Sequence, residues 1–219
     1  MNDEGRVQKL KKAYANGVID IDEFEDEITE ELRKGARRSD YLNTSDELGQ
    51  QVWMSEGRDE EPDPAELRPV DGDMHLPIKP KGGMWTSTYT PENEHDSDWI
   101  RWCSTEGFYG GRHKWLIEPK DNLNVLVVDG MEDLQAVMSV YRKEFYKGTK
   151  ASLIGAHPLD FELIAEDFDA MRLTKEGQWN TRLTGVDEPD LYGWDSESVL
   201  NFRWNWKDYE YIGCCDSTF

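Results

Sequence analysis

The residues of this sequence that best fit chemistry are one carboxylate and three side chains on a separate strand. Glu197 stands at the start of a predicted strand, and Trp85, Ser87 and Tyr89 alternate along another. Alternate residues of a strand lie on one face, so these three side chains are expected together. A carboxylate held beside them could stabilise a positive charge that develops during a reaction. The competing interpretation is structural, because aromatic residues also fill cores and acidic residues often flank turns.

This outline resembles the active site of ADP-ribosyltransferases. In that family a glutamate orients the nicotinamide ribose of NAD, and aromatic and hydroxyl groups hold the rest of the molecule. The resemblance implies NAD as the ligand and Glu197, Ser87, Tyr89 and Trp85 as site residues. The family pattern also has an arginine or histidine that opens its first strand. Here only His75 or Lys79 could take that place.

Other candidate sites follow no known spacing. Residues 92–98 contain four acidic side chains and one histidine, but they match neither a calcium loop nor a zinc signature. We therefore expect no metal site there. Cys103 and His113 lack a third member of a nucleophilic triad. Two glycine pairs, at 82–83 and 110–111, are too short for a phosphate-binding loop.

The elements that must position these residues lie beyond residue 80, where eight of the nine tryptophans occur. Residue patterns predict strands at 84–89, 114–118, 124–129 and 199–206, and helices at 97–107, 131–141 and 159–168. A hairpin is predicted over 170–174 and 178–183, around Gly177. The strand at 124–129 is almost continuous in valine and leucine, so both of its faces should be covered. Residues 81–219 are therefore predicted to form an α+β domain with a mostly antiparallel sheet and packed helices.

Residues 39–80 have the composition of a linker. They contain five prolines, an acidic run at 59–61 and several serine, threonine and asparagine residues. Such a composition does not form a packed core, so an extended acidic arm is predicted. One short helix is predicted within it, at 47–54, with Leu48, Val52 and Trp53 as its apolar side.

Residues 1–38 are predicted to form a helical hairpin. Apolar residues recur at spacings of three and four, Asn16 and Gly17 supply the turn, and Asp20 with Glu23 fits a capping box. Two helices of about a dozen residues bury too little surface to fold alone. The apolar stripes should therefore bind a partner: Val7, Leu10, Tyr14, Phe24, Ile28 and Leu32. The alternative is a hairpin packed on its own domain.

Two further resemblances concern origin and association. Residues 7–32 resemble the SHOCT motif, a short helical hairpin found at the ends of larger proteins, including proteins of phages and haloarchaeal viruses. That resemblance implies protein association. Segments of the domain resemble an uncharacterised family of phages and bacteria: 79–87, 97–99, 177–179 and 191–198. That family has no agreed activity, so the second resemblance implies a viral origin and no particular chemistry.

Composition favours a halophilic setting. Asp and Glu outnumber Lys and Arg by 46 to 25, which gives a net charge of −21. A compact body with this charge repels itself unless salt screens it. A mesophilic acidic protein or a nucleic-acid mimic is the alternative, and the thirteen lysines are many for a halophile. The charge disfavours nucleic acid and anionic membranes as direct partners.

The remaining signals exclude some locations. No apolar run approaches the roughly 18 residues that span a bilayer, and the start of the sequence lacks a signal-peptide pattern. Three cysteines, two of them the adjacent Cys214 and Cys215, do not form a disulfide framework. We expect neither a secreted nor a transmembrane protein.

These observations lead to one expected function and two alternatives. The leading expectation is a non-enzymatic structural component of a halophilic archaeal tailed virus, located in the virion or the host cytoplasm. Its hairpin and arm would bind capsid, portal or tail neighbours in a symmetric assembly, without cofactor, metal or catalytic residue. The first alternative is an NAD-consuming enzyme, and the second is a cellular regulator whose hairpin recruits a partner.

Overall fold

A computed structural model describes residues 42–71, 79–92, 95–108, 110–141, 159–182, 191 and 193–215, and the single positions 13, 18, 23 and 27. The predicted hairpin at 1–38, with the six residues expected to bind a partner, lies outside these ranges apart from the single positions. His75 also lies outside them. Within the described part, no helix is long and apolar enough to cross a bilayer.

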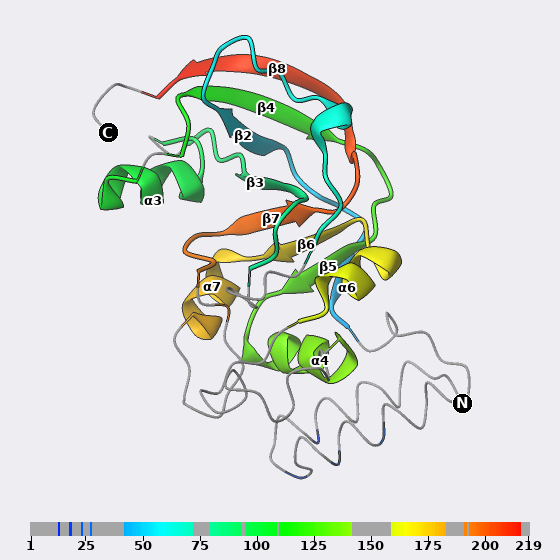
Figure 1. Ribbon diagram of the computed structural model, residues 1–219. Helices are drawn as coiled ribbons and strands as arrows, with labels where there is room; N and C mark the ends of the chain where they lie inside the picture. Colours follow the sequence, from blue (N-terminus) through cyan, green and yellow to red (C-terminus); the bar gives the residue numbers. More distant parts are fainter. Residues whose placement is uncertain are drawn as a thin grey trace.

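Eight strands form one mixed sheet, in the order β1-β5-β6-β7-β3-β2-β4-β8 (Figure 1). Their bounds are β1 Thr44–Ser45, β2 Gln51–Ser55, β3 Met84–Thr88, β4 His113–Pro119, β5 Val125–Val128, β6 Ala170–Leu173, β7 Ser198–Asn201 and β8 Trp206–Cys214. Only β5 and β6 pair in parallel. The predicted α+β class with a mostly antiparallel sheet is confirmed.

The sheet separates into two halves between β2 and β3. These two strands share only the partner pairs Gln51–Thr88 and Val52–Ser87. On its other side β2 pairs with β4, and on its other side β3 pairs with β7. We call β1, β5, β6, β7 and β3 the β5 half, and β2, β4 and β8 the β4 half. The two halves diverge from this short shared ladder.

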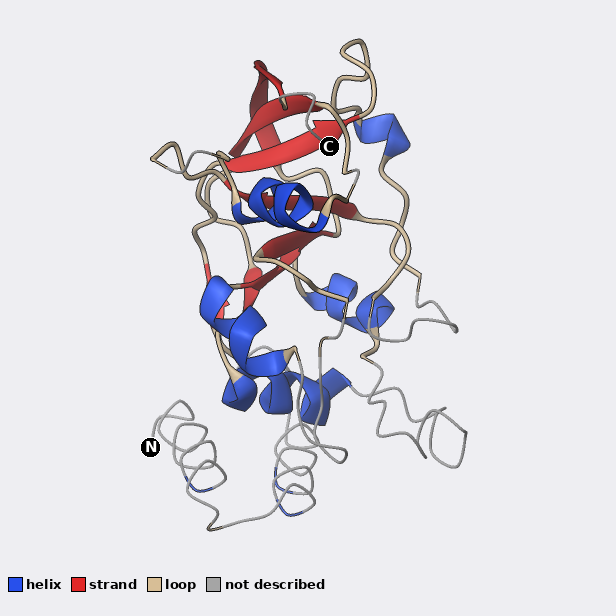
Figure 2. Cartoon of the chain, turned by 90° about the vertical axis from the view of Figure 1, so that its left-hand side faces the viewer, coloured by secondary structure: helices blue, strands red, loops and turns tan. Residues whose placement is uncertain are grey.

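Four α-helices accompany the sheet in the described residues: α3 Asp98–Glu106, α4 Met131–Tyr141, α6 Phe161–Asp167 and α7 Lys175–Thr181. Helices α4, α6 and α7 lie at the β5 half, whereas α3 lies beside β3 (Figure 1). Figure 2 shows the strands running through the centre of the molecule, with most of the helical ribbon below them.

Two apolar cores follow from this arrangement. The first packs the helices on one face of the β5 half and contains Phe161, Phe168 and Trp194. The second lies on the other face and includes Trp115 and Trp206. Strand β5 contributes Leu126 and Val128 to the first core and Val125 to the second. The prediction that both faces of this strand are covered is therefore confirmed.

Local signals set the ends of the predicted helices. The Ser97 hydroxyl accepts a hydrogen bond from the Ile100 N–H at the start of α3, and Gly107 ends that helix with φ +65°. Asp160 caps α6 in the same way through the Leu163 N–H. The three predicted helices and the strands at 84–89, 114–118 and 124–129 are confirmed.

The prediction of a short helix at 47–54 is wrong, because Gln51–Ser55 forms β2 in the interior of the sheet. This strand has neighbours on both sides, β3 and β4, and those pairings outweigh local helical spacing. The described part of the expected linker is likewise integral to the domain. β1 pairs with β5, and Leu42, Leu48 and Val70 are buried.

Two other predicted elements are corrected. Residues 175–181 form α7 and not the second strand of a hairpin, since the Thr174 hydroxyl caps the helix at the Gly177 N–H. The predicted strand at 199–206 ends at Asn201, and a new strand begins at Trp206. β7 pairs with β3 and β6, whereas β8 pairs with β4. The chain passes from one half of the sheet to the other between them.

The excess negative charge predicts a salt-dependent stability. Raising KCl from about 0.1 M to about 1 M shortens the Debye length from about 10 Å to about 3 Å and weakens self-repulsion. We expect Tm to rise by about 5–10 °C, equivalent to a few kcal/mol for a chain of this size. Tryptophan fluorescence during heating measures this, with NaCl at equal ionic strength as the control. A Tm that stays constant or falls with salt would contradict the prediction.

Candidate functional site

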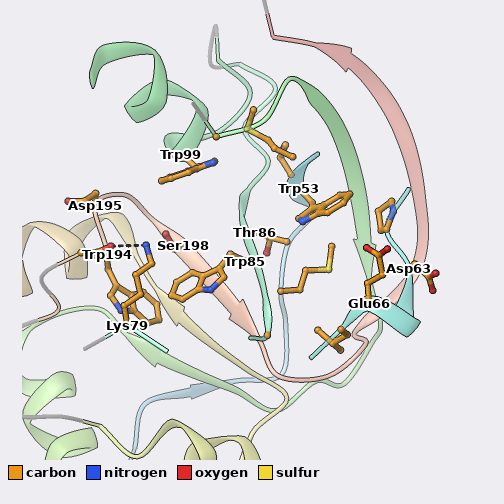
Figure 3. A pocket seen from close by; sticks show the side chains of 18 residues that line it. Trp53, Asp63, Glu66, Lys79, Trp85, Thr86, Trp99, Trp194, Asp195 and Ser198 are labelled. Atoms are coloured by element: carbon orange, nitrogen blue, oxygen red, sulfur yellow. Dashed lines mark hydrogen bonds between the residues drawn. The ribbon is translucent and has the colours of Figure 1, made fainter. Parts of the chain in front are cut away.

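A cleft of about 400 Å³ opens where β2 and β3 diverge (Figure 3). β2 contributes Trp53 to one wall, and β3 contributes Trp85 and Thr86 to the other. The other lining residues come from the segment around the 3-10 helix Pro64–Glu66, from the chain that leads into β3, from α3 and the turn after it, and from the start of β7 and the chain before it. They include Asp63, Glu66, Leu67, Lys79, Trp99, Gly193, Trp194, Asp195 and Ser198. The separation of the two half-sheets therefore creates the cavity.

Tryptophan side chains form most of the walls. Trp85 meets Trp194 edge to face, with ring centroids 4.6 Å apart. Trp99 stacks on Trp102 at 5.2 Å, which fixes the plane of its ring. Trp53 faces this group from β2 (Figure 3). Rigid aromatic walls of this kind suit a ligand with a flat ring, which gains apolar burial and ring contacts.

One ammonium group and three carboxylates add charge to the cleft. The Lys79 Nζ lies 5.0 Å from the Trp85 ring centroid and donates to the Gly193 carbonyl at 3.0 Å. Burial lowers the pKa of Lys79, and the nearby charge of Asp195 partly opposes this effect. The carboxylates belong to Asp63, Glu66 and Asp195. Asp195 also pairs with Arg182 at 2.6 Å.

Glu197 lies at the junction of β7 and β3 and is only 5% exposed. Its carboxylate accepts hydrogen bonds from the Ser87 hydroxyl at 2.8 Å, the Thr88 hydroxyl at 2.6 Å and the Thr88 N–H at 2.8 Å. The Arg172 Nε donates at 3.4 Å. All four groups are donors, so they stabilise the ionised carboxylate in one orientation.

Asp98 ties the start of α3 to Glu197. It accepts the Glu197 N–H at 3.1 Å and pairs with Arg101 at 2.7 Å and Lys175 at 3.3 Å. Burial alone would raise the pKa of Asp98, but hydrogen bonds from Arg101 and the Glu197 N–H, with the nearby positive charges, hold it below its usual value. The Trp99 N–H also donates to the Ser87 hydroxyl at 3.4 Å. One network thus supports both a cleft wall and the buried carboxylate.

The residues expected at an active site are partly brought together. Ser87 and Glu197 are hydrogen-bonded, and Trp85 lies in the cleft. Thr86 and Ser198, the chain neighbours of Ser87 and Glu197, also line the cleft, whereas Ser87, Tyr89 and Glu197 do not.

Tyr89 lies beyond the end of β3, where its N–H donates to the Gln50 carbonyl at 2.8 Å. Of the two proposed stand-ins for a basic residue, Lys79 lines the cleft.

Comparisons of the chain with family models, curated proteins and solved structures found no match. The assignment of function therefore depends on the geometry. The aromatic walls of the cleft suit a flat ring, and the buried Glu197 lies one residue from the lining residue Ser198.

Several cleft residues were not expected from the sequence. Trp53, Asp63 and Glu66 fall in the segment that was read as a linker. Val52 is β-branched and Trp53 is aromatic, and both residue types are typical of strands. This local pattern is the sequence feature that could have indicated β2. Nothing local marks Asp63 and Glu66, because their place in the cleft depends on how the chain returns from β2 towards β3.

The other candidate groups have structural partners. Asp96 of the acidic loop pairs with Lys114, and no cluster of three or more His, Cys, Asp or Glu residues in the described ranges could hold a metal ion. Cys103 is buried, and burial raises its pKa to about 12, so its thiol stays protonated. His113 contacts the Tyr211 hydroxyl at 3.1 Å and the Cys214 sulfur at 3.5 Å, on the β4 half.

Proposed function

We propose that the cleft binds NAD and that Glu197 promotes cleavage of the bond between nicotinamide and ribose. The observation that carries this proposal is the pairing of Glu197 with Ser87, whose chain neighbours Ser198 and Thr86 line the tryptophan-walled cleft. Both residues are among the four that the resemblance to ADP-ribosyltransferases implies as site residues. The cleft gives the flat ring a place to bind, and the carboxylate gives the reaction its electrostatic support.

The chemistry needs a fixed negative charge near the ribose. As nicotinamide leaves, positive charge develops on the sugar, and a carboxylate that is already oriented stabilises it without reorganising. Hydrogen bonds from Ser87 and Thr88 hold Glu197 in this way. Ser198 follows Glu197 in the chain and lines the cleft, so a sugar bound there would lie one residue along the strand from Glu197.

Basic residues near the cleft could bind the phosphates. Lys79 is one of the lining residues. Arg68 is exposed and follows the lining residue Leu67, and its carbonyl accepts the N–H of Gly83, another lining residue, at 2.8 Å. These two positive groups offset part of the negative charge of Asp63, Glu66 and Asp195.

The test is the release of nicotinamide from NAD, measured by chromatography with purified protein in high salt. We expect Glu197→Gln to lower the rate by at least about 100-fold, since removal of one stabilising group costs about 2.7–4 kcal/mol in comparable sites. Glu118→Gln is the matched control, because Glu118 lies on β4 and bonds with Gln50 and Lys207 outside the cleft.

Thermal unfolding of both variants separates a loss of activity from a loss of folding. Two outcomes would overturn the proposal. One is a wild-type rate no higher than that of buffer. The other is a folded Glu197→Gln variant that is as active as the wild type.

A second role is favoured by the sequence of residues 1–38. We propose that this hairpin attaches the domain to another protein, as in a component of a halophilic viral particle. Its predicted apolar stripes and the resemblance to the SHOCT motif support this role. Deleting residues 1–38 should abolish incorporation into particles. Unchanged incorporation would count against this second role.

A further inference from the structure

We propose that Cys214, together with His113 and Tyr211, forms a nucleophilic thiol site that reacts with hydroperoxides. The three side chains come together at the end of β8 and the start of β4 (Figure 1). His113 and Cys214 are 101 residues apart in the chain, so nothing local marks the pair. None of the three residues lines the cleft, and the inference does not depend on the proposed binding of NAD.

An irregularity in the pairing of β4 with β8 brings these side chains onto one face. His113 is paired with Cys214 across the two strands. Trp115, two residues further along β4, is paired with Tyr211, three residues before Cys214, so β8 carries one extra residue. Residues three apart in a regular strand point to opposite faces, and the extra residue cancels this separation. Gly213 lies in the bulge with φ +125°, a conformation that favours glycine.

The contacts within the cluster connect the thiol with a base and with a hydroxyl group. The Cys214 sulfur lies 3.5 Å from His113 Nδ1 and 3.1 Å from the Tyr211 hydroxyl. The same hydroxyl lies 3.1 Å from His113 Nδ1. The Arg58 guanidinium lies over the Tyr211 ring, 5.0 Å from its centroid, and adds a positive charge beside the cluster. Cys214 itself is exposed, so a small molecule can reach the sulfur.

These partners suit the formation of a thiolate. The thiolate is the reactive form of cysteine, and a neighbouring histidine generates it by accepting the thiol proton. In this site His113 Nδ1 takes the proton from Cys214, and the Tyr211 hydroxyl donates a hydrogen bond to the sulfur. The hydrogen bond with Cys214 raises the pKa of Tyr211, and the charge of Arg58 opposes this only in part, so the phenol remains a donor.

The reaction with a hydroperoxide is a displacement at oxygen. The Cys214 thiolate attacks the terminal oxygen, so that a sulfur–oxygen bond forms while the oxygen–oxygen bond breaks. The sulfur is oxidised by two electrons to a sulfenic acid, and the peroxide is reduced. The leaving alkoxide takes the proton that His113 holds and departs as an alcohol, or as water when hydrogen peroxide reacts. One thiol and one hydroperoxide give one sulfenic acid and one alcohol, with no further reactant.

The reactivity of the thiol is measured with iodoacetamide near pH 7, on the full chain in high salt. Peptide mass spectrometry assigns the modification to Cys214 or to Cys215. An ordinary thiol is only a few per cent ionised at this pH, so we expect Cys214 to react about tenfold faster than glutathione. This comparison needs no variant.

Two variants and a control identify the source of this reactivity. His113→Asn removes the base and should slow the alkylation of Cys214 by about tenfold. Tyr211→Phe removes the hydrogen-bond donor and should slow it by about threefold. His95→Asn is the matched control, because His95 lies in the loop before α3, and its rate should equal that of the wild type. Thermal unfolding shows whether each variant is folded.

Hydrogen peroxide, added with a cyclic 1,3-diketone that traps sulfenic acids, tests the proposed reaction itself. The trap should label Cys214 in the wild type and should label it about tenfold more slowly in His113→Asn. Three outcomes would overturn the inference: alkylation of wild-type Cys214 no faster than that of glutathione, no trapped sulfenic acid at Cys214, or equal labelling of Cys214 in the wild type and in a folded His113→Asn variant.

Discussion

Replacing Glu197 with alanine is expected to lower the free energy of unfolding by about 3–4 kcal/mol. The change leaves the Ser87 and Thr88 hydroxyls and the Thr88 N–H without their acceptor in a buried place, and it leaves Arg172 without its counterion. Denaturant unfolding followed by tryptophan fluorescence measures the loss. Glu197→Gln keeps an acceptor oxygen and should cost less, about 1–2 kcal/mol.

The comparison of Glu197→Ala with Glu197→Gln separates the contribution of Glu197 to stability from its contribution to activity. Glu118→Ala provides the control, since Glu118 forms a solvent-exposed pair with Lys207, and such pairs contribute little to stability. If Glu197→Ala is destabilised by no more than this control, the hydrogen-bond network around Glu197 does not hold the carboxylate as described. A Glu197→Gln variant that is stable but inactive would assign the lost activity to the charge.

Replacing Gly177 with alanine is expected to destabilise the protein by about 3 kcal/mol or more. A Cβ at this position would lie 2.2 Å from the Val128 carbonyl oxygen, so α7 would have to move away from the end of β5. This clash outweighs the helix propensity of alanine, which favours it over glycine by about 1 kcal/mol. The expected fall in Tm is about 6–12 °C for a chain of this size.

Gly130→Ala is the matched control for that experiment. Gly130 precedes α4, and a Cβ built there meets nothing within 4 Å. Its stability should stay within about 0.5 kcal/mol of the wild type. A Gly177→Ala variant as stable as Gly130→Ala would show that α7 does not pack against β5 at this distance.

The sequence predicts those elements whose signals are local. Helix α3 has a serine cap before it and a glycine after it, and both act within one turn. Strand β2 was missed because its identity comes from β3 and β4, which lie far along the chain. For the segment that forms α7, the sequence predicts the turn and second strand of a hairpin because of Gly177. That glycine instead permits the close approach of the helix to Val128.

The strand at 199–206 shows how an alternating pattern can mislead. Leu200, Phe202, Trp204 and Trp206 alternate as one strand would. In the structure Leu200 and Phe202 belong to the first core, whereas Trp206 belongs to the second. The bend between them carries the chain from one half of the sheet to the other. The alternation of apolar residues alone does not predict that the chain changes its pairing strands between β7 and β8.

The candidate site, like the fold, could be predicted from the sequence only in part. The proximity of Ser87 and Glu197 follows from two strands that were both found, although their direct pairing had to come from the structure. Tyr89 was expected with them, but β3 ends at Thr88 and Tyr89 does not line the cleft. The wall formed by Trp53 depends on the point at which β2 and β3 separate. No local pattern specifies that point.

The proposed NAD site is tested most directly by a crystal structure with an analogue of NAD whose ribose ring oxygen is replaced by carbon, so that the bond to nicotinamide stays intact. We expect the nicotinamide ring in the cleft between Trp53 and Trp85, with the adjoining sugar beside Ser198. An analogue bound elsewhere on the protein, or a cleft that stays empty at saturating concentration, would contradict it.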